Sequence, residues 1–175
     1  MGSFDLGKLV DNIEKEAQKT ISRELNAFKN TANETEKPKH IKTINENMEG
    51  SSVAGVPYRK QIIRINGEKY EGVFPRFEAK YQMMLPQRLY RASDDEQMKY
   101  CTQRLKLAIE RNPDLARNFT ARQLEQIKDG NARISGLTWH HNERPGIMQL
   151  VDANAHSAAR HTGGRSIWGG GGDYR

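Results

Sequence analysis

The histidines of this chain restrict its fold more than any other feature, because four of the five lie between residues 137 and 164: His140, His141, His156 and His161. Histidine is the commonest metal ligand in proteins and the side chain that most easily exchanges a proton near neutral pH. A doublet followed by two further histidines at near-helical spacing is typical of a metal-centred catalytic site. We therefore expect this segment to fold around a metal ion.

The same segment predicts a β-hairpin followed by a helix. Residues 137–141 and 147–151 have the composition of short strands, and the residues between them are rich in turn formers. Asp152 or Asn154 can cap a helix that runs through Arg160, before a glycine pair stops it. A hairpin and a helix of this size can hold one metal ion between them.

The two histidines of the doublet cannot have the same role if the first segment is a strand. Successive side chains of a strand point to opposite faces, so one of His140 and His141 can face the metal and the other the attacking water. His156 and His161 lie about 140° apart around an ideal helix. They converge only if the last helical turn loosens toward Gly163.

These motifs resemble the WHH branch of the HNH/endonuclease VII nuclease superfamily. The matching elements, in chain order, are Trp139-His140-His141, Met148-Gln149-Leu150-Val151, His156 and His161-Thr162-Gly163-Gly164. Domains of this family occur mostly as the toxic C-terminal tips of bacterial polymorphic and contact-dependent toxins, and they share the ββα-metal fold of the nuclease colicins. The lead-in through Phe119 also resembles the family, and the similarity extends back toward Phe77.

The resemblance implies a role for each histidine and a reaction. In that superfamily the first histidine of the pair binds metal and the second is the general base, so His140 would be a ligand and His141 the base. His156 and His161 hold the positions of the helix ligands, so we expect His140 and His161 to bind the metal together with His156. The reaction implied is metal-assisted hydrolysis of phosphodiester bonds in DNA.

The residue types limit which metal ion and which phosphate contacts we expect. An all-imidazole ligand set favours Zn²⁺, Ni²⁺ or Mn²⁺, although water and phosphate oxygens leave Mg²⁺ open. Arg144, Arg160 and Arg165 are candidate phosphate contacts, or alternatively plain surface charges. Because contacts to phosphates carry no sequence information, we expect little sequence specificity.

The charge distribution also favours a nucleic-acid substrate. The chain has a formal net charge of +6. Residues 1–55 contain 8 Lys and Arg against 9 Asp and Glu, which leaves 20 against 13, or +7, for residues 56–175. The positive excess therefore lies in the part that carries the histidines, as phosphate binding requires. The alternative is that the excess only aids solubility.

We predict an α+β fold in two parts. Residues 1–55 should form an amphipathic helix over 4–32 and a polar linker over 33–55. Residues 56–175 should form the nuclease domain, with its motif core at 137–164 and a glycine-rich tail at 165–175. This domain should begin with a β-hairpin around Asn66-Gly67, the strongest short hairpin signal.

A mainly helical platform should support the hairpin and helix of the motif. Ser93 with Glu96, and Thr120 with Gln123, have the spacing of capping boxes at the starts of two helices. The remaining expectations concern single side chains: Met83, Met84, Leu85 and Cys101 in the core, Trp139 bracing the hairpin, Glu78 at the surface or behind the metal ligands, and Trp168 either in the core or stacked on a base.

Other features restrict the setting of the protein. The single cysteine excludes an intramolecular disulfide and a Cys-rich zinc module. No apolar run approaches the ~18 residues of a membrane span, and no signal-peptide core follows the initiator methionine. We therefore expect a soluble protein that is exported, if at all, by a specialised route or with a carrier segment.

The toxin resemblance implies partners and a place of action. A producing bacterium would make the protein in its cytoplasm and need a cognate immunity protein, which we expect to be acidic to complement the basic domain. The toxin would be secreted and would act in the cytoplasm of a target cell. The N-terminal helix could bind a carrier or secretion partner, or it could pack on its own domain or self-associate.

Two other functional classes remain open on the residues alone. The histidines could form a structural zinc site in a nucleic-acid-binding module without catalysis, which would have no need for a base beside a ligand. The chain could also be an interaction protein that acts through its N-terminal helix, and its function would then survive loss of every histidine.

Overall fold

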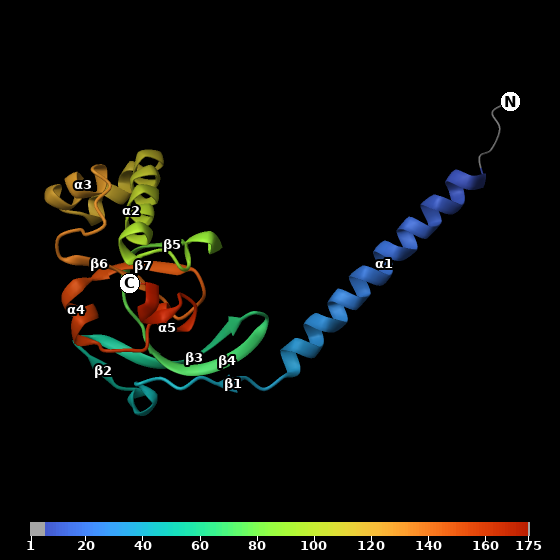
Figure 1. The fold of residues 1–175 in the computed structure, drawn as a ribbon, viewed down its shortest axis with the longest axis horizontal. Helices are drawn as coiled ribbons and strands as arrows, with labels where there is room; N and C mark the ends of the chain where they lie inside the picture. Colours follow the sequence, from blue (N-terminus) through green and yellow to red (C-terminus); the bar gives the residue numbers. More distant parts are fainter. Residues whose placement is uncertain (1–5, 175) are drawn as a thin grey trace. The chain divides into compact units, whose positions relative to one another are not determined.

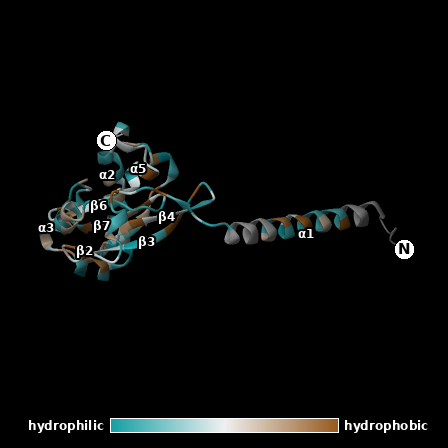
Figure 2. Ribbon diagram, turned by 90° about the horizontal axis from the view of Figure 1, so that it is seen from below, coloured by the Kyte–Doolittle hydropathy of each residue, from teal (hydrophilic) through white to brown (hydrophobic). Residues whose placement is uncertain are grey.

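The computed structural model describes the backbone of residues 6–174 and the side chains of residues 12–27 and 36–173. The chain forms two compact units, Met1–Lys37 and Pro38–Arg175. The first unit contains one long helix, α1 (Leu6–Thr35), so the predicted N-terminal helix is present. Its apolar side chains at Ile13, Ile21 and Leu25 are all more than half exposed. Figure 2 shows brown, hydrophobic bands along this helix. Of the other apolar residues of the predicted amphipathic helix, Ala17 is also exposed, and the rest lie outside the described side chains.

The second unit begins well before the boundary that we predicted. Residues 38–55, for which we expected a linker, form β1 (Lys39–His40), the 3₁₀ turn η1 (Glu46–Met48) and β2 (Ser52–Val53). Thr43 is buried, and its hydroxyl donates a hydrogen bond to the carbonyl of Val73. This segment gains its structure by pairing with strands that follow it in the sequence, which its polar, aperiodic composition cannot reveal.

The first sheet is built on the predicted hairpin. Its strands β3 (Val56–Ile65) and β4 (Glu68–Pro75) pair antiparallel, and the four-stranded order is β1-β4-β3-β2. The turn residues Asn66 and Gly67 both have positive φ angles, 51° and 83°. A two-residue turn of this type matches the right-handed twist of its strands, which explains the Asn-Gly pair.

The second sheet contains the motif hairpin and one strand that we did not predict. Its order is β5-β7-β6, with β5 (Ala79–Met84), β6 (Leu137–His141) and β7 (Ile147–Asp152) all antiparallel. Successive side chains of β5 point to opposite faces of the sheet, and they alternate between the core and solvent. Met84 is therefore 66% exposed, contrary to our expectation, whereas Leu85 is buried in the core as predicted.

Helices cover the side of this second sheet that faces away from the first (Figure 1). The main ones are α2 (Asp94–Arg111) and α3 (Ala121–Lys128), with short 3₁₀ helices η2 (Gln87–Leu89) and η3 (Pro113–Asn118) beside them. Their predicted N-caps are present. The Ser93 side chain accepts a hydrogen bond from the backbone of Glu96, and Thr120 with Gln123 forms a complete capping box.

One hydrophobic core joins these helices to the second sheet. It includes Cys101 and Leu105 of α2 with Trp139, Met148 and Leu150 of the motif hairpin. Burial raises the pKa of the Cys101 thiol to about 12, so this cysteine is an inert core residue, as predicted. Within the described residues, no helix is both long and apolar enough to cross a membrane.

The chain ends in short helices after the motif hairpin. These are α4 (Ala153–Ala158), α5 (Gly164–Ile167) and the 3₁₀ turn η4 (Gly171–Tyr174). The side chain of Asp152 caps α4 by accepting a hydrogen bond from the backbone of Ala155. The segment from 165 to 168, which we assigned to a glycine-rich tail, is instead packed, and Arg165 is only 3% exposed.

Candidate metal and catalytic site

The structure brings together three of the four motif histidines. His140 comes from β6, His156 from α4 and His161 from the loop after α4. Each offers one ring nitrogen, and these nitrogens lie within 4.8 Å of one another. In the described part of the chain this is the one group of three or more His, Cys, Asp or Glu side chains with the spacing of a metal site.

The early end of α4 allows His156 and His161 to converge. The helix stops at Ala158, two residues before the predicted end, so His161 lies in a loop and is free of the helical angle. The Nδ1 atom of His161 lies 2.7 Å from the carbonyl oxygen of Ala159. Because a carbonyl can only accept, Nδ1 donates this bond and Nε2 keeps the lone pair that binds a metal.

The electrostatics of the cluster keep its rings neutral. Burial lowers the pKa of His140 well below the ordinary value of 6.5, and the neighbouring histidines lower it further. Burial is also the main cause that lowers the pKa of His156, to about 4, and of His161. A neutral imidazole is the form that binds a metal, so the three rings have a suitable protonation state at neutral pH.

The spacing of the nitrogens fits one small metal ion. His140 Nδ1 lies 3.2 Å from His156 Nε2. Two ligands of a tetrahedral ion with metal–nitrogen bonds of about 2.0–2.1 Å are roughly 3.3 Å apart. The second nitrogen of His140, Nε2, is buried and has no hydrogen-bond partner among the described residues. The donor set therefore fits a divalent cation of the zinc type.

The ring of Phe77 packs against all three clustered histidines. Its ring centroid lies 4.7 Å from that of His140, 5.3 Å from that of His156 and 5.4 Å from that of His161. The ring limits how far the imidazoles can rotate and keeps part of the cluster dry. No sequence pattern predicted this contact, because Phe77 lies in the connection between β4 and β5, far from the motif.

His141 points to the opposite side of β6 from the cluster, as strand alternation predicts. Its Nε2 lies 2.6 Å from Oε1 of Gln97 and 4.0 Å from a carboxylate oxygen of Asp94, both on α2. Its ring also contacts Trp168, at 5.6 Å between centroids. His141 nevertheless lines the same cavity as the three clustered histidines, a hollow of about 420 Å³.

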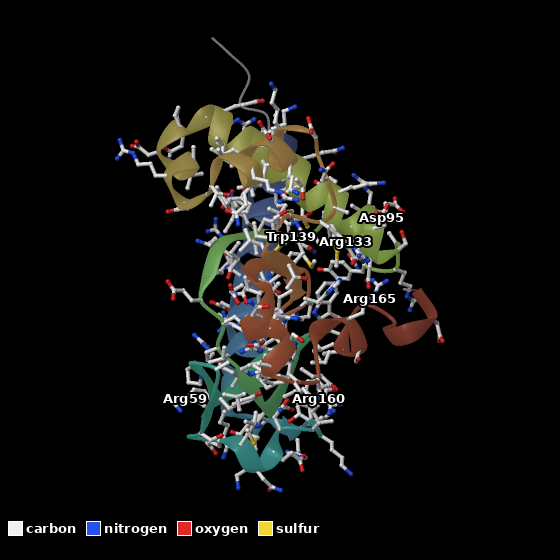
Figure 3. The ribbon with its side chains drawn as sticks, turned by 90° about the vertical axis from the view of Figure 1, so that its left-hand side faces the viewer. Arg59, Asp95, Arg133, Trp139, Arg160 and Arg165 are labelled. Carbon is white, nitrogen blue, oxygen red and sulfur yellow. The ribbon has the colours of Figure 1, made fainter. Side chains whose placement is uncertain are left out.

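The three candidate arginines have different environments. Arg160 is exposed and lines the histidine cavity. Arg144 is exposed in the hairpin turn and lines a separate hollow of about 100 Å³ beside Arg76. Arg165 is buried in the cavity wall, so it is not the plain surface charge of our alternative reading. Figure 3 shows Arg160 and Arg165 at well-separated places around the C-terminal segment.

The buried guanidinium of Arg165 braces the start of α2. It donates hydrogen bonds to the carbonyls of Tyr90 and Ala92, at 3.1 and 2.8 Å. Its Nε lies 3.2 Å from the carboxylate of Asp94. Arg165 therefore holds the Asp94 carboxylate beside His141. The side chains of Asp94 and His141 both line the cavity.

The two tryptophans are structural in their contacts. Trp139 is 2% exposed and donates its indole N–H to the hydroxyl of Thr102, which fixes β6 on α2 as predicted. Trp168 packs on Tyr90 and donates to the carbonyl of Asn142, so it is in contact with the core. Glu78 is exposed, and it does not line the histidine cavity.

Comparison with known protein families identifies the class of protein that this site belongs to. Residues 66–163 match the family described as the DNase/tRNase domain of colicin-like bacteriocin. The match spans more than half of the chain and contains all four motif histidines. The chain therefore belongs to this family of nuclease toxin domains. Comparisons with curated proteins and with solved structures gave no match.

Proposed function

We propose that this chain is a metal-dependent DNase toxin with a ββα-metal site of the WHH type. The observation that carries the proposal is the convergence of His140, His156 and His161 at the end of a β-hairpin and its following helix, inside a colicin-type nuclease domain. His140 is buried, His156 and His161 are half-buried, and the lowered pKa values of all three favour neutral imidazoles. A divalent cation would stabilise three such rings facing one another.

The three histidines would hold the cation, with the hydrogen bond from His161 Nδ1 to Ala159 fixing one ring. When bound, the cation supplies charge neutralisation at the scissile phosphate and at the leaving oxygen. Arg160, exposed at the cavity, would contact a phosphate of the same strand. Zn²⁺, Ni²⁺ or Mn²⁺ suits these ligands best, and Mg²⁺ is the alternative that the metal series must test.

His141 would act as the general base. It lines the cavity but faces away from the metal cluster, so its ring is not one of those that would hold the cation. The oxygen of a water molecule would bond to phosphorus while its proton moves to the imidazole. The bond from phosphorus to the leaving oxygen then breaks, and solvent supplies the proton that this oxygen takes up.

We propose DNA rather than tRNA as the substrate, although the family includes nucleases for both. The support is the resemblance of the motif to the WHH branch. The net charge of +7 over residues 56–175 suits either polyanion. Binding through phosphates predicts little sequence specificity.

The biological setting follows from the toxin class. We propose that the protein is secreted from a bacterium and acts in the cytoplasm of a target cell, and that an acidic immunity protein protects the producer. Co-purification from the native host tests the last point. A toxin that the host tolerates in free form, with all four motif histidines intact, would contradict it. Helix α1, with its exposed apolar residues, would bind the carrier.

Plasmid cleavage by the purified protein tests the enzymatic proposal. We expect nicking that EDTA abolishes and that divalent metals restore to different extents. His141→Ala should lower the rate by about 10²–10⁴-fold, the usual contribution of a general base, while zinc remains bound. His140→Ala should lose the metal. His40→Ala is the matched control, because His40 is exposed and pairs with Glu46 outside the site.

Two results would contradict the proposal. Cleavage of tRNA but not of DNA would assign the other activity of the family. Failure to cleave either, with tight and salt-dependent nucleic-acid binding and one bound zinc, would instead support a zinc-stabilised binding module.

A further inference from the structure

Gln97 occupies a position in α2 from which it can control the histidine that we assign as the base. Its side chain is fully buried, at 0% exposure, on the same helix as Asp94. The amide Nε2 lies 2.6 Å from the carbonyl oxygen of Leu89 and 3.0 Å from that of Tyr90. Carbonyl oxygens can only accept, so the amide nitrogen must face them and Oε1 must face His141.

This orientation of the amide decides which nitrogen of His141 carries a proton. Oε1 of Gln97 is only an acceptor, and it lies 2.6 Å from Nε2 of His141. The Asp94 carboxylate oxygen, 4.0 Å from the same nitrogen, is an acceptor too. Nε2 must therefore be the donor, and in the neutral ring Nδ1 is then the atom with the lone pair.

We infer that Gln97 is a positioning residue that holds His141 in the Nε2–H tautomer, so that Nδ1 takes the proton from water. The inference rests on the proposed function only for the role of His141 as the base. The tautomer itself follows from the contacts of Gln97. When His141 gains a proton at Nδ1, Gln97 Oε1 and the Asp94 carboxylate, held by Arg165, stabilise the resulting positive charge.

Two substitutions separate this role from a structural one. Gln97→Met and Gln97→Glu both lose the donor to Leu89 and Tyr90, but only glutamate keeps an acceptor for His141. A purely structural role predicts at least as much damage in Gln97→Glu as in Gln97→Met, because the buried carboxylate would face the two carbonyl oxygens. A positioning role predicts that Gln97→Met lowers kcat about 10- to 100-fold, less than the ~10²–10⁴-fold loss expected when the base itself is removed. Gln97→Glu should then recover part of that loss, and zinc affinity should stay unchanged in both.

Thr102→Val is the matched control. Thr102 is equally buried on the same helix and contacts Trp139 rather than His141. This variant should cleave plasmid at close to the wild-type rate. Circular dichroism of each variant shows whether the fold is retained.

A spectroscopic measurement tests the tautomer without activity. Two-bond ¹H–¹⁵N correlation spectra of the full-length, metal-free protein should show His141 as the Nε2–H form in the wild type and a mixture in Gln97→Met. An Nδ1–H form in the wild type, or a loss of cleavage in Gln97→Glu at least as large as in Gln97→Met, would overturn the inference. A wild-type protein that cleaves nothing would refute the proposed function, while the spectra would still decide whether Gln97 fixes the ring.

Discussion

At the scale of single residues, burial sets the chemical state of the polar side chains around the site. The three clustered histidines are held neutral by it, and so is the thiol of Cys101. Glu143, in the turn of the motif hairpin, shows the same effect on an acid. It is 3% exposed, and burial raises the pKa of its carboxyl above the ordinary 4.5, although Arg144 and Arg76 oppose the shift.

Glu143→Gln should therefore stabilise the protein by an amount that grows with pH. The folded state holds this proton more tightly than the unfolded state, so wild-type stability falls as pH rises from about 4.5 through the folded pKa. The gap between variant and wild type should widen by at most about 1.4 kcal/mol per pH unit, the limit for one proton. Urea unfolding of both proteins in EDTA from pH 4 to 8 measures it.

Glu125→Gln provides the control for this comparison, because Glu125 is exposed on α3. It measures the effect of replacing a surface carboxylate by an amide in the same protein. A gap for Glu143→Gln that stays constant over the same range would show that the buried carboxyl keeps an unshifted pKa.

At the scale of elements, the length of α4 and the loop behind it determine whether the site can form. Two consecutive glycines, Gly163 and Gly164, follow this loop at the end of the motif, and they have different surroundings in the structure. A side chain at Gly163 would make only ordinary contacts, the nearest at 3.5 Å to His161. A Cβ at Gly164 would overlap the carbonyl oxygen of Asn142 and the indole nitrogen of Trp168. Gly164 therefore allows α5 to pack against the motif hairpin.

Gly164→Ala should destabilise the protein by about 3 kcal/mol, the upper range for overpacking a dense site. The effect is steric, because the obstacle is backbone that cannot rotate away. Gly172→Ala is the control. Nothing lies within 4 Å of a Cβ at Gly172, so its stability should stay within about 0.5 kcal/mol of the wild type. Thermal unfolding of both variants compares them, and equal stabilities would contradict the packing described for α5.

At the scale of the whole molecule, the segment before the first hairpin supports the loop that carries His161. Asn45 Nδ2 donates to the carbonyl of Arg160 at 2.7 Å, and the hydroxyl of Tyr58 donates to the same oxygen at 3.0 Å. The backbone N–H of Ile44 donates to the hydroxyl of Thr162 at 3.1 Å. These bonds hold the residues on both sides of His161, although their donors lie more than a hundred residues earlier in the sequence.

Two truncations test this support. Removal of residues 1–37 deletes only the first compact unit, so the unfolding midpoint and zinc affinity should stay unchanged. Removal of residues 1–55 also deletes the hydrogen bonds from Ile44 and Asn45, so it should lower both the unfolding midpoint and the zinc affinity. Calorimetry with zinc titration measures the two quantities. Equal behaviour of the two truncated chains would show that residues 38–55 do not stabilise the site.

The sequence was sufficient for features that depend on neighbouring residues. The Asn66-Gly67 hairpin, the caps at Ser93, Thr120 and Asp152, and the opposite faces of His140 and His141 all follow from local backbone geometry. It could not reveal strand β5, whose pairing partner β7 lies far along the chain. The same holds for residues 38–55, which pair with later strands.

By itself the sequence predicted which residues would carry the chemistry, because the histidine motif and its hairpin are contained in one short segment. Only the tertiary structure decided how that chemistry is held in place. Phe77, Gln97 and Arg165 reach the site from three other elements, and their contacts exist only once the sheet and helices have packed. The physical reason is that side-chain identity and local periodicity depend only on residues that are close together in the sequence. Burial, tautomer and charge pairing arise from residues that folding brings together.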